Sequence, residues 1–74
     1  MRAGELSSGA ARLAKAWDKL RLRWEATQLD WHDAVSQEFE ATYLSPLEQQ
    51  ISATISRMKT LAGVVNTAEH ECDR

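Results

Sequence analysis

The side chains best suited to chemistry lie near the carboxyl terminus, in residues 69–73, which read Glu-His-Glu-Cys-Asp. Imidazole, thiolate and carboxylate groups are the usual ligands of Zn²⁺, and a closed site needs about four of them. His70 and Cys72 are two positions apart, however, and such residues do not face the same way on a helix. No second cluster in the sequence supplies further ligands. We therefore predict no metal site and no cofactor; the alternative is a small metal-binding or enzymatic helical protein that uses the region of His70 and Cys72.

His32 and Asp33 could also suggest acid–base catalysis. A catalytic pair must be positioned in a concave site, and two packed helices offer no deep pocket. The carboxylates from Glu25 to Glu48 lie in a stretch without lysine or arginine. A di-metal carboxylate bundle would need Glu-x-x-His motifs on inward faces, and the sequence contains none. We predict no catalytic residue, and we expect the acidic stretch to be solvated or to dock a basic partner.

The elements that carry these residues are predicted from the spacing of apolar residues. Trp17, Trp24 and Trp31 stand seven residues apart, close to two turns of an α-helix, so the three indoles lie on one stripe. Steps of three and four residues are typical of a heptad seam. A second heptad runs through Leu47, Ile51, Ile55, Met58, Leu61, Val65, Ala68 and Cys72. The pattern predicts an all-α, coiled-coil-like antiparallel hairpin of two helices.

Ser45, Pro46 and Glu48 mark the turn that the sequence favours. Proline suits the first position of a helix and is disfavoured in its interior. Ser45 and Glu48 have the spacing of a capping box, in which each side chain bonds a free backbone N–H. The predicted boundaries are a flexible N-terminus over 1–9 and a hairpin domain over 10–74, with helices over 10–44 and 46–72 and the turn near 45.

The position of the turn determines which residues face one another. With a turn near 45, Trp31 meets Met58, Trp24 meets Val65, and Trp17 meets Cys72. Each indole then faces a smaller side chain, which is how facing layers fill space. The predicted core stripe comprises Trp17, Trp24, Trp31, Phe39, Met58 and Val65.

A turn at residues 31–33 is the alternative fold. It places Leu20 near Leu44, and it brings the residues before Leu20 alongside those after Pro46. Against this alternative, Pro46 would lie inside a long second helix, and the residues beyond about 58 would lack a partner.

Two leucines lie off the main seam, where a lone hairpin would expose them. Leu22 and Leu29 are also seven residues apart. With Leu47, Leu61 and Val64 they form a possible dimer face. Two seams on one hairpin are typical of a four-helix bundle made of two chains. We therefore expect a homodimer, or a pair with a homologous helical-hairpin protein.

Composition excludes several classes of function. The chain has 74 residues, close to the smallest size at which one core suffices. Its formal net charge of −2 gives no case for binding nucleic acid, which usually requires a basic face. No apolar run is long enough to span a membrane, and the first nine residues lack the apolar core of a signal peptide. We expect a cytoplasmic protein that binds neither nucleic acid nor membrane.

The chain resembles the WXG-type family, small helical-hairpin proteins related to early secretory antigens, in its size, its paired helices and Trp31 near mid-chain followed by Phe39. The run from Trp31 through Tyr43 to Pro46 also resembles small bacterial proteins of similar architecture. The first resemblance implies export by a type VII route. Asp33 stands where the family has glycine, and the family's C-terminal Tyr-x-x-x-acidic signal has no counterpart, because Tyr43 is the only tyrosine. The function we expect is a non-enzymatic protein–protein interaction or assembly module.

Overall fold

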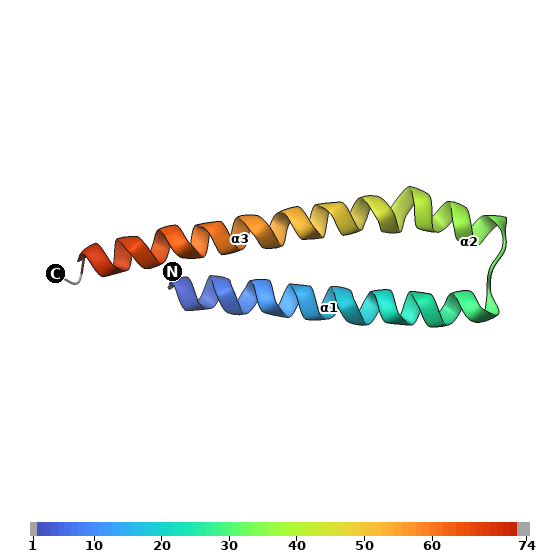
Figure 1. Ribbon diagram of the computed structural model, residues 1–74, viewed down its shortest axis with the longest axis horizontal. Coiled ribbons are helices and arrows are strands. Elements are labelled where there is room, and N and C mark those ends of the chain that lie inside the picture. The colour runs from blue at the N-terminus through green and yellow to red at the C-terminus, as the bar shows by residue number, and fades with distance from the viewer. Residues whose placement is uncertain (1, 73–74) are drawn as a thin grey trace.

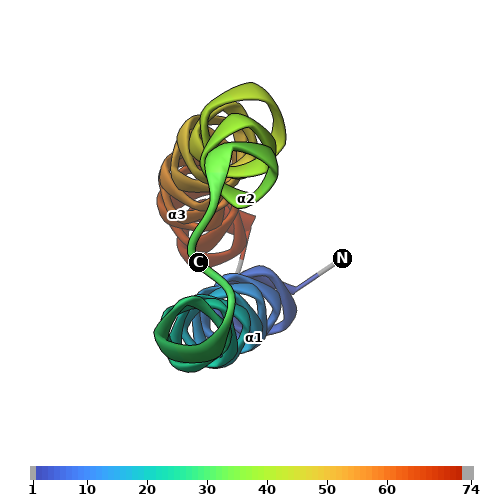
Figure 2. The same ribbon diagram turned by 90° about the vertical axis from the view of Figure 1, so that its right-hand side faces the viewer.

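The computed structural model describes residues 2–72 and shows two long helical rods lying side by side (Figure 1). In chain order the elements are α1 (Ala3–Asp30), α2 (Ala34–Phe39), the π-helix η1 (Glu40–Leu44) and α3 (Ser45–Cys72). The last three follow one another as a single rod that runs back along α1 (Figure 1). The predicted all-α antiparallel two-helix hairpin is confirmed. Viewed along its axis, the hairpin is a single layer of two rods (Figure 2), with extents of 60 × 18 × 12 Å.

The predicted turn near residue 45 is wrong, and the chain instead reverses at residues 31–33. The helix predicted over 10–44 is therefore interrupted in its middle. Helix α1 also begins at Ala3, so most of the N-terminal segment predicted to be flexible, residues 1–9, is helical. The alternative turn is the one that the structure contains.

Asp33 and Ser36 explain why the chain turns where it does. The Ser36 backbone N–H donates to Asp33 Oδ1 at 2.9 Å, and the Asp33 backbone N–H donates to Ser36 Oγ at 3.0 Å. This reciprocal capping box satisfies two backbone donors that a helix start leaves free. The indole Nε1–H of Trp31 donates to Asp33 Oδ2 at 3.0 Å. One carboxylate thus joins the end of α1 to the start of α2.

Replacing Asp33 with alanine should lower the urea midpoint of unfolding, whereas Asp33→Asn should largely preserve it, because asparagine caps helices about as well as aspartate. The Ser36 N–H, with help from the Trp31 indole, holds the pKa of Asp33 below its ordinary value of 3.8, although desolvation opposes the shift. A carboxylate with a lowered folded pKa stabilises the protein above its unfolded pKa and loses that effect as pH falls through the folded value. The difference between wild type and Asp33→Ala should therefore shrink below pH 3.8. A difference that stays constant into strong acid would contradict the capping role.

Pro46 lies inside the return rod because the turn before it is wider than an α-helical turn. The Ser45 N–H donates to the Glu40 carbonyl, the five-residue bond of a π-helix. In a regular α-helix the proline ring would clash with the carbonyl four residues earlier, which belongs to Thr42. The wider turn changes the position of that carbonyl. Ser45 consequently has helical backbone angles (φ −64°, ψ −45°) and does not cap a new helix.

Small residues let the two rods approach at the open end of the hairpin. Ala3 and Ala10 on α1 and Ala62 on α3 are buried. A Cβ added to Gly9 would lie 3.0 Å from Met58 Cε, so the Met58 side chain reaches the backbone of α1 there.

Two contacts at this end determine the register of the hairpin. The Ala3 N–H donates to Glu69 Oε1 at 3.2 Å, and Met58 lies beside Gly9. The predicted pairing of Met58 with Trp31 is therefore wrong. In the same register Val65 and Cys72 lie toward the open end, so their predicted pairings with Trp24 and Trp17 are wrong as well. With a turn at residues 31–33, the residues beyond about 58 were expected to lack a partner. In the structure they pack beside the first residues of α1.

Candidate interaction surface

An aromatic cluster joins the two rods next to the turn. The ring of Trp24 lies edge-on to Trp31, with centroids 6.0 Å apart and planes at 82°. It also packs on Phe39, at 5.3 Å, and Phe39 packs on Tyr43, at 5.4 Å. Trp24 is partly buried, whereas Trp31 and Phe39 remain 39% and 40% exposed. The cluster therefore extends from the interior, at Trp24, to the surface, at Tyr43.

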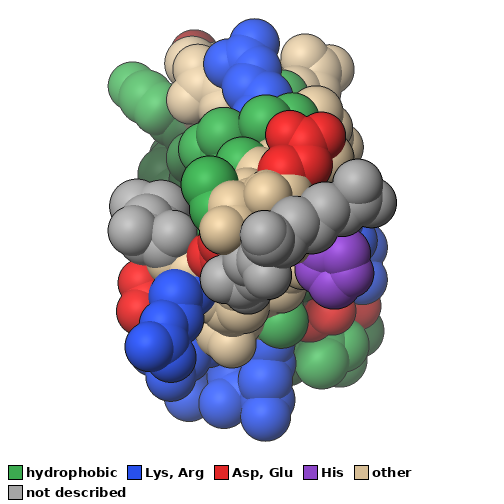
Figure 3. Space-filling model, turned by 90° about the vertical axis from the view of Figure 1, so that its left-hand side faces the viewer, with side chains coloured by type: hydrophobic (Ala, Val, Ile, Leu, Met, Phe, Trp, Pro, Cys, Tyr) green, Lys and Arg blue, Asp and Glu red, His purple; other side chains and the backbone are tan. Residues whose placement is uncertain are grey.

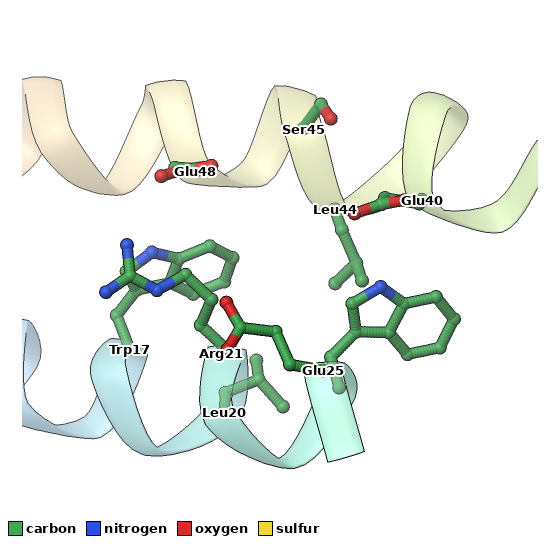
Figure 4. A pocket seen from close by; sticks show the side chains of 9 residues that line it. Trp17, Leu20, Arg21, Glu25, Glu40, Leu44, Ser45 and Glu48 are labelled. Atoms are coloured by element: carbon green, nitrogen blue, oxygen red, sulfur yellow. The ribbon is translucent and has the colours of Figure 1, made fainter. Parts of the chain in front are cut away.

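A small cavity lies beside this cluster (Figure 4), with a volume of about 110 Å³. In Figure 4, Leu44 points from the return rod toward α1, and Trp17 lies between the two rods. The Nε1 atoms of Trp17 and Trp24 are buried and have no hydrogen-bond partner within residues 2–72. An unpaired buried N–H usually costs about 1–3 kcal/mol. The cavity is lined by Trp17, Leu20, Arg21, Trp24, Glu25, Glu40, Leu44, Ser45 and Glu48.

The predicted core stripe is divided between the two ends of the hairpin. Trp24, Trp31 and Phe39 are in contact near the turn. Met58 and Val65 are partly buried but lie toward the open end. The residues of the stripe predicted from spacing therefore do not form one cluster, and two of them, Trp31 and Phe39, are also part of the exposed surface.

The predicted dimer face is also divided. Leu22 and Leu29 are 61% and 88% exposed. At 100° per residue, each lies about 140° around α1 from the tryptophan five positions before it, so both point away from the return rod. In an antiparallel pair, this rotation places them on the opposite flank from Leu61 and Val64. The structure therefore does not bring Leu22 and Leu29 together with Leu47, Leu61 and Val64.

Helical spacing places the other exposed large apolar residues, most of them on the return rod, on the flank opposite Leu22 and Leu29, and we call this set the apolar flank. Val35 and Tyr43, at 63% and 62% exposure, lie next to Phe39 on the return rod. In Figure 3, seen from the open end, hydrophobic side chains gather on one side of α3, while lysines and arginines are concentrated on α1. The members of the apolar flank are Leu20, Trp31, Val35, Phe39, Tyr43, Leu47, Leu61 and Val64.

The residues with metal-binding potential do not form a site in the part of the chain that the structure describes. Within residues 2–72, no three histidine, cysteine, aspartate or glutamate side chains come together in a way that could hold a metal ion. Cys72 is a free, exposed thiol, and His70 is exposed on the last turn of α3. Asp73 lies outside the described residues. None of the described helices has an apolar stretch long enough to cross a membrane.

Comparison with protein-family models, curated proteins and solved structures finds no match for this chain. The resemblance to the WXG-type family therefore stays a prediction. The surface of the hairpin itself carries the evidence on function.

Proposed function

We propose that this chain is a non-enzymatic protein–protein interaction or assembly module, and that its exposed apolar side chains are the binding surface. One observation carries the proposal. Within residues 2–72 the hairpin buries only Ala3, Ala10, Ala62 and Ser36, while ten large apolar side chains stay exposed. Large exposed apolar patches on soluble proteins usually mark interaction sites.

The surface area of the hairpin supports this proposal. A compact protein of 8.3 kDa exposes about 4,600 Å², whereas this chain exposes 5921 Å². The excess is about 1,300 Å², and a standard protein interface covers about 800 Å² on each partner. The radius of gyration, 17.2 Å, likewise exceeds the value of about 11 Å for a compact domain of this length. The isolated hairpin thus has enough surplus surface for a partner.

The class of partner that we propose is another helical hairpin. Domains are usually built from at least two packed layers, and residues 2–72 form a single layer of two rods. A second hairpin across the apolar flank would complete a four-helix bundle with a shared core. A homodimer and a pair with a homologous hairpin both satisfy this requirement.

Site-specific photo-cross-linking in cells that make the protein tests the proposal for any partner, whatever its identity. A photoreactive residue at position 43, on the apolar flank, should cross-link to one defined protein, which can be a second copy. The matched control carries the same residue at position 49, which is exposed and lies about 200° around α3 from Leu47. Equal or absent cross-linking at both positions would contradict the proposal. Stoichiometric metal in the purified protein would instead favour the alternative function near His70 and Cys72.

A further inference from the structure

We infer that the partner is a second copy of this chain, packed apolar flank to apolar flank with the two turns pointing in opposite directions. The inference rests on the proposed function and adds the identity of the partner, the face that it covers and its orientation. Three features carry it: the length of the flank, the charges along its border and the distribution of charge along the sequence.

The apolar flank is large enough for a stable dimer. From Val35 to Val64 it follows the return rod for about 44 Å at 1.5 Å per residue. The hairpin is 18 Å across in its second dimension. The product is about 800 Å² on each copy, the usual contribution of one partner to a specific interface. A flat, single-layer face of this kind can pair with an identical face around a two-fold axis.

Charges that border the apolar flank on the return rod favour pairing with a second copy only when the two return rods run in opposite directions. Glu38 lies one turn after Val35. Arg57 lies one turn before Leu61 and two turns before Val64, so both charged residues border the flank. Both charged residues are exposed; the acidic one is near the turn and the basic one is nearer the open end. Antiparallel packing brings Glu38 of each copy near Arg57 of the other copy. Parallel packing would place like charges together.

Helix α1 carries the same polarity along its length. Asp30 lies at its turn end and Arg12 toward the open end, a separation of about 27 Å at 1.5 Å per residue. Glu38 and Arg57 are separated by about 28 Å on the return rod. When the two-fold axis of the dimer passes near Leu20 and Leu47, Asp30 of one copy approaches Arg12 of the other. Glu38 of one copy approaches Arg57 of the other at the same time. Such border charges mainly set orientation, because exposed ion pairs add little affinity.

The sequence as a whole has the same asymmetry of charge. Residues 24–48 contain no lysine or arginine, and their charged side chains are all acidic. Most of the basic residues lie between Arg12 and Arg23 or at Arg57 and Lys59. The turn end of the hairpin is therefore acidic and its middle is basic. In the antiparallel dimer, the acidic part of each copy lies beside the basic part of the other. This match is why we favour a second copy over an unrelated helical protein.

Solution mass measured by light scattering on the full chain, with reductant present, tests the identity of the partner. Wild type should have twice the 8.3 kDa mass of one chain. Tyr43→Glu places a charge in the flank and should weaken association at least tenfold, while Gln49→Glu adds the same charge outside the flank and should leave the dimer intact. Circular dichroism shows whether each variant remains helical. A monomeric wild type, or a helical Tyr43→Glu dimer as stable as wild type, would overturn the inference.

Orientation needs a separate measurement. A spin label on Ala34→Cys, in a chain that also carries Cys72→Ser, should report a label-to-label distance of about 35–40 Å in the antiparallel dimer, from the helical rise. Parallel packing would bring the labels to within about 20 Å and would overturn the orientation. Glu38→Lys and Arg57→Glu should each weaken association about threefold, and the double variant should restore it. Additive weakening in the double variant would also contradict the antiparallel arrangement.

The two proposals can fail separately. A monomeric wild type whose position 43 cross-links to a different protein in cells would end the second-copy inference but would keep the interaction function. A monomer that cross-links to nothing would end both.

Discussion

Replacing Trp24 with alanine is expected to lower the free energy of unfolding by about 3–5 kcal/mol, the usual cost of removing a large core aromatic residue. Trp24 is the centre of the aromatic cluster. It contacts Trp31, which directly follows α1, and Phe39 on the return rod. Its contact with Phe39 joins the two rods near the turn, together with the hydrogen bond that Gln28 Nε2 donates to Glu40 Oε2 at 3.1 Å. Because small domains have only a few kcal/mol of net stability, most of the variant should be unfolded at room temperature. Urea unfolding followed by circular dichroism measures the loss.

Two controls separate packing from other effects of this substitution. Trp24→Phe keeps one aromatic ring and removes the rest of the indole, including an N–H that has no partner within residues 2–72, so its cost should be smaller than that of alanine. Leu29→Ala removes a side chain that is 88% exposed and should change stability by less than about 0.5 kcal/mol. Near-unchanged stability in Trp24→Ala, together with lost partner binding, would mean that Trp24 is an exposed binding residue.

Replacing Ala10 with leucine is the second large effect that we expect. Ala10 is 1% exposed at the place where small residues let the rods approach, and overpacking such a site costs about 1–3 kcal/mol. The neighbouring substitution Ala11→Leu adds the same atoms at an exposed position. It should have almost no effect on the urea midpoint.

The comparison of Ala10→Leu with Ala11→Leu also tests the position of the turn. With the turn at residues 31–33, Ala10 packs against the return rod near Met58 and Ala62. With a turn near 45, the residue facing Ala10 would have a number beyond the last residue of this chain, and leucine at position 10 would be tolerated. Equal stability of the two variants would therefore contradict the fold described above.

The helical hairpin could be predicted from the sequence because its signal is local and repeated. Trp17, Trp24 and Trp31 recur at the heptad interval, and the second heptad after Pro46 is equally regular. Each heptad predicts a helix with one apolar stripe, and two such stripes in a short chain must pack together.

The turn could not be predicted because two capping signals compete. Ser45 and Glu48, next to Pro46, match the usual capping box, whereas Asp33 and Ser36 form one with serine in place of glutamate. The choice depends on contacts between residues far apart in sequence, such as Ala3 with Glu69 and Gly9 with Met58. The π-helix that accommodates Pro46 is a further feature that local spacing does not predict.

The exposed apolar surface could be predicted only in part. Leu47, Leu61 and Val64 belong to the apolar flank, but Leu22 and Leu29 lie on the other side of the hairpin. Spacing alone makes Val35 and Tyr43 a continuation of the tryptophan stripe, and it does not assign them to this surface. Their four-residue steps after Trp31 show the stripe drifting around the helix, and this drift is the signal that could have identified them.

The most direct test of the central claim, that this hairpin is completed by a second copy, is the dependence of its unfolding midpoint on protein concentration. When folding and dimerisation are coupled, each tenfold dilution removes about 1.4 kcal/mol of apparent stability. We predict a urea midpoint that falls steadily on dilution for wild type and for Gln49→Glu. A wild-type midpoint that is independent of concentration over the whole dilution series would contradict the claim, because it would show that one hairpin is stable alone.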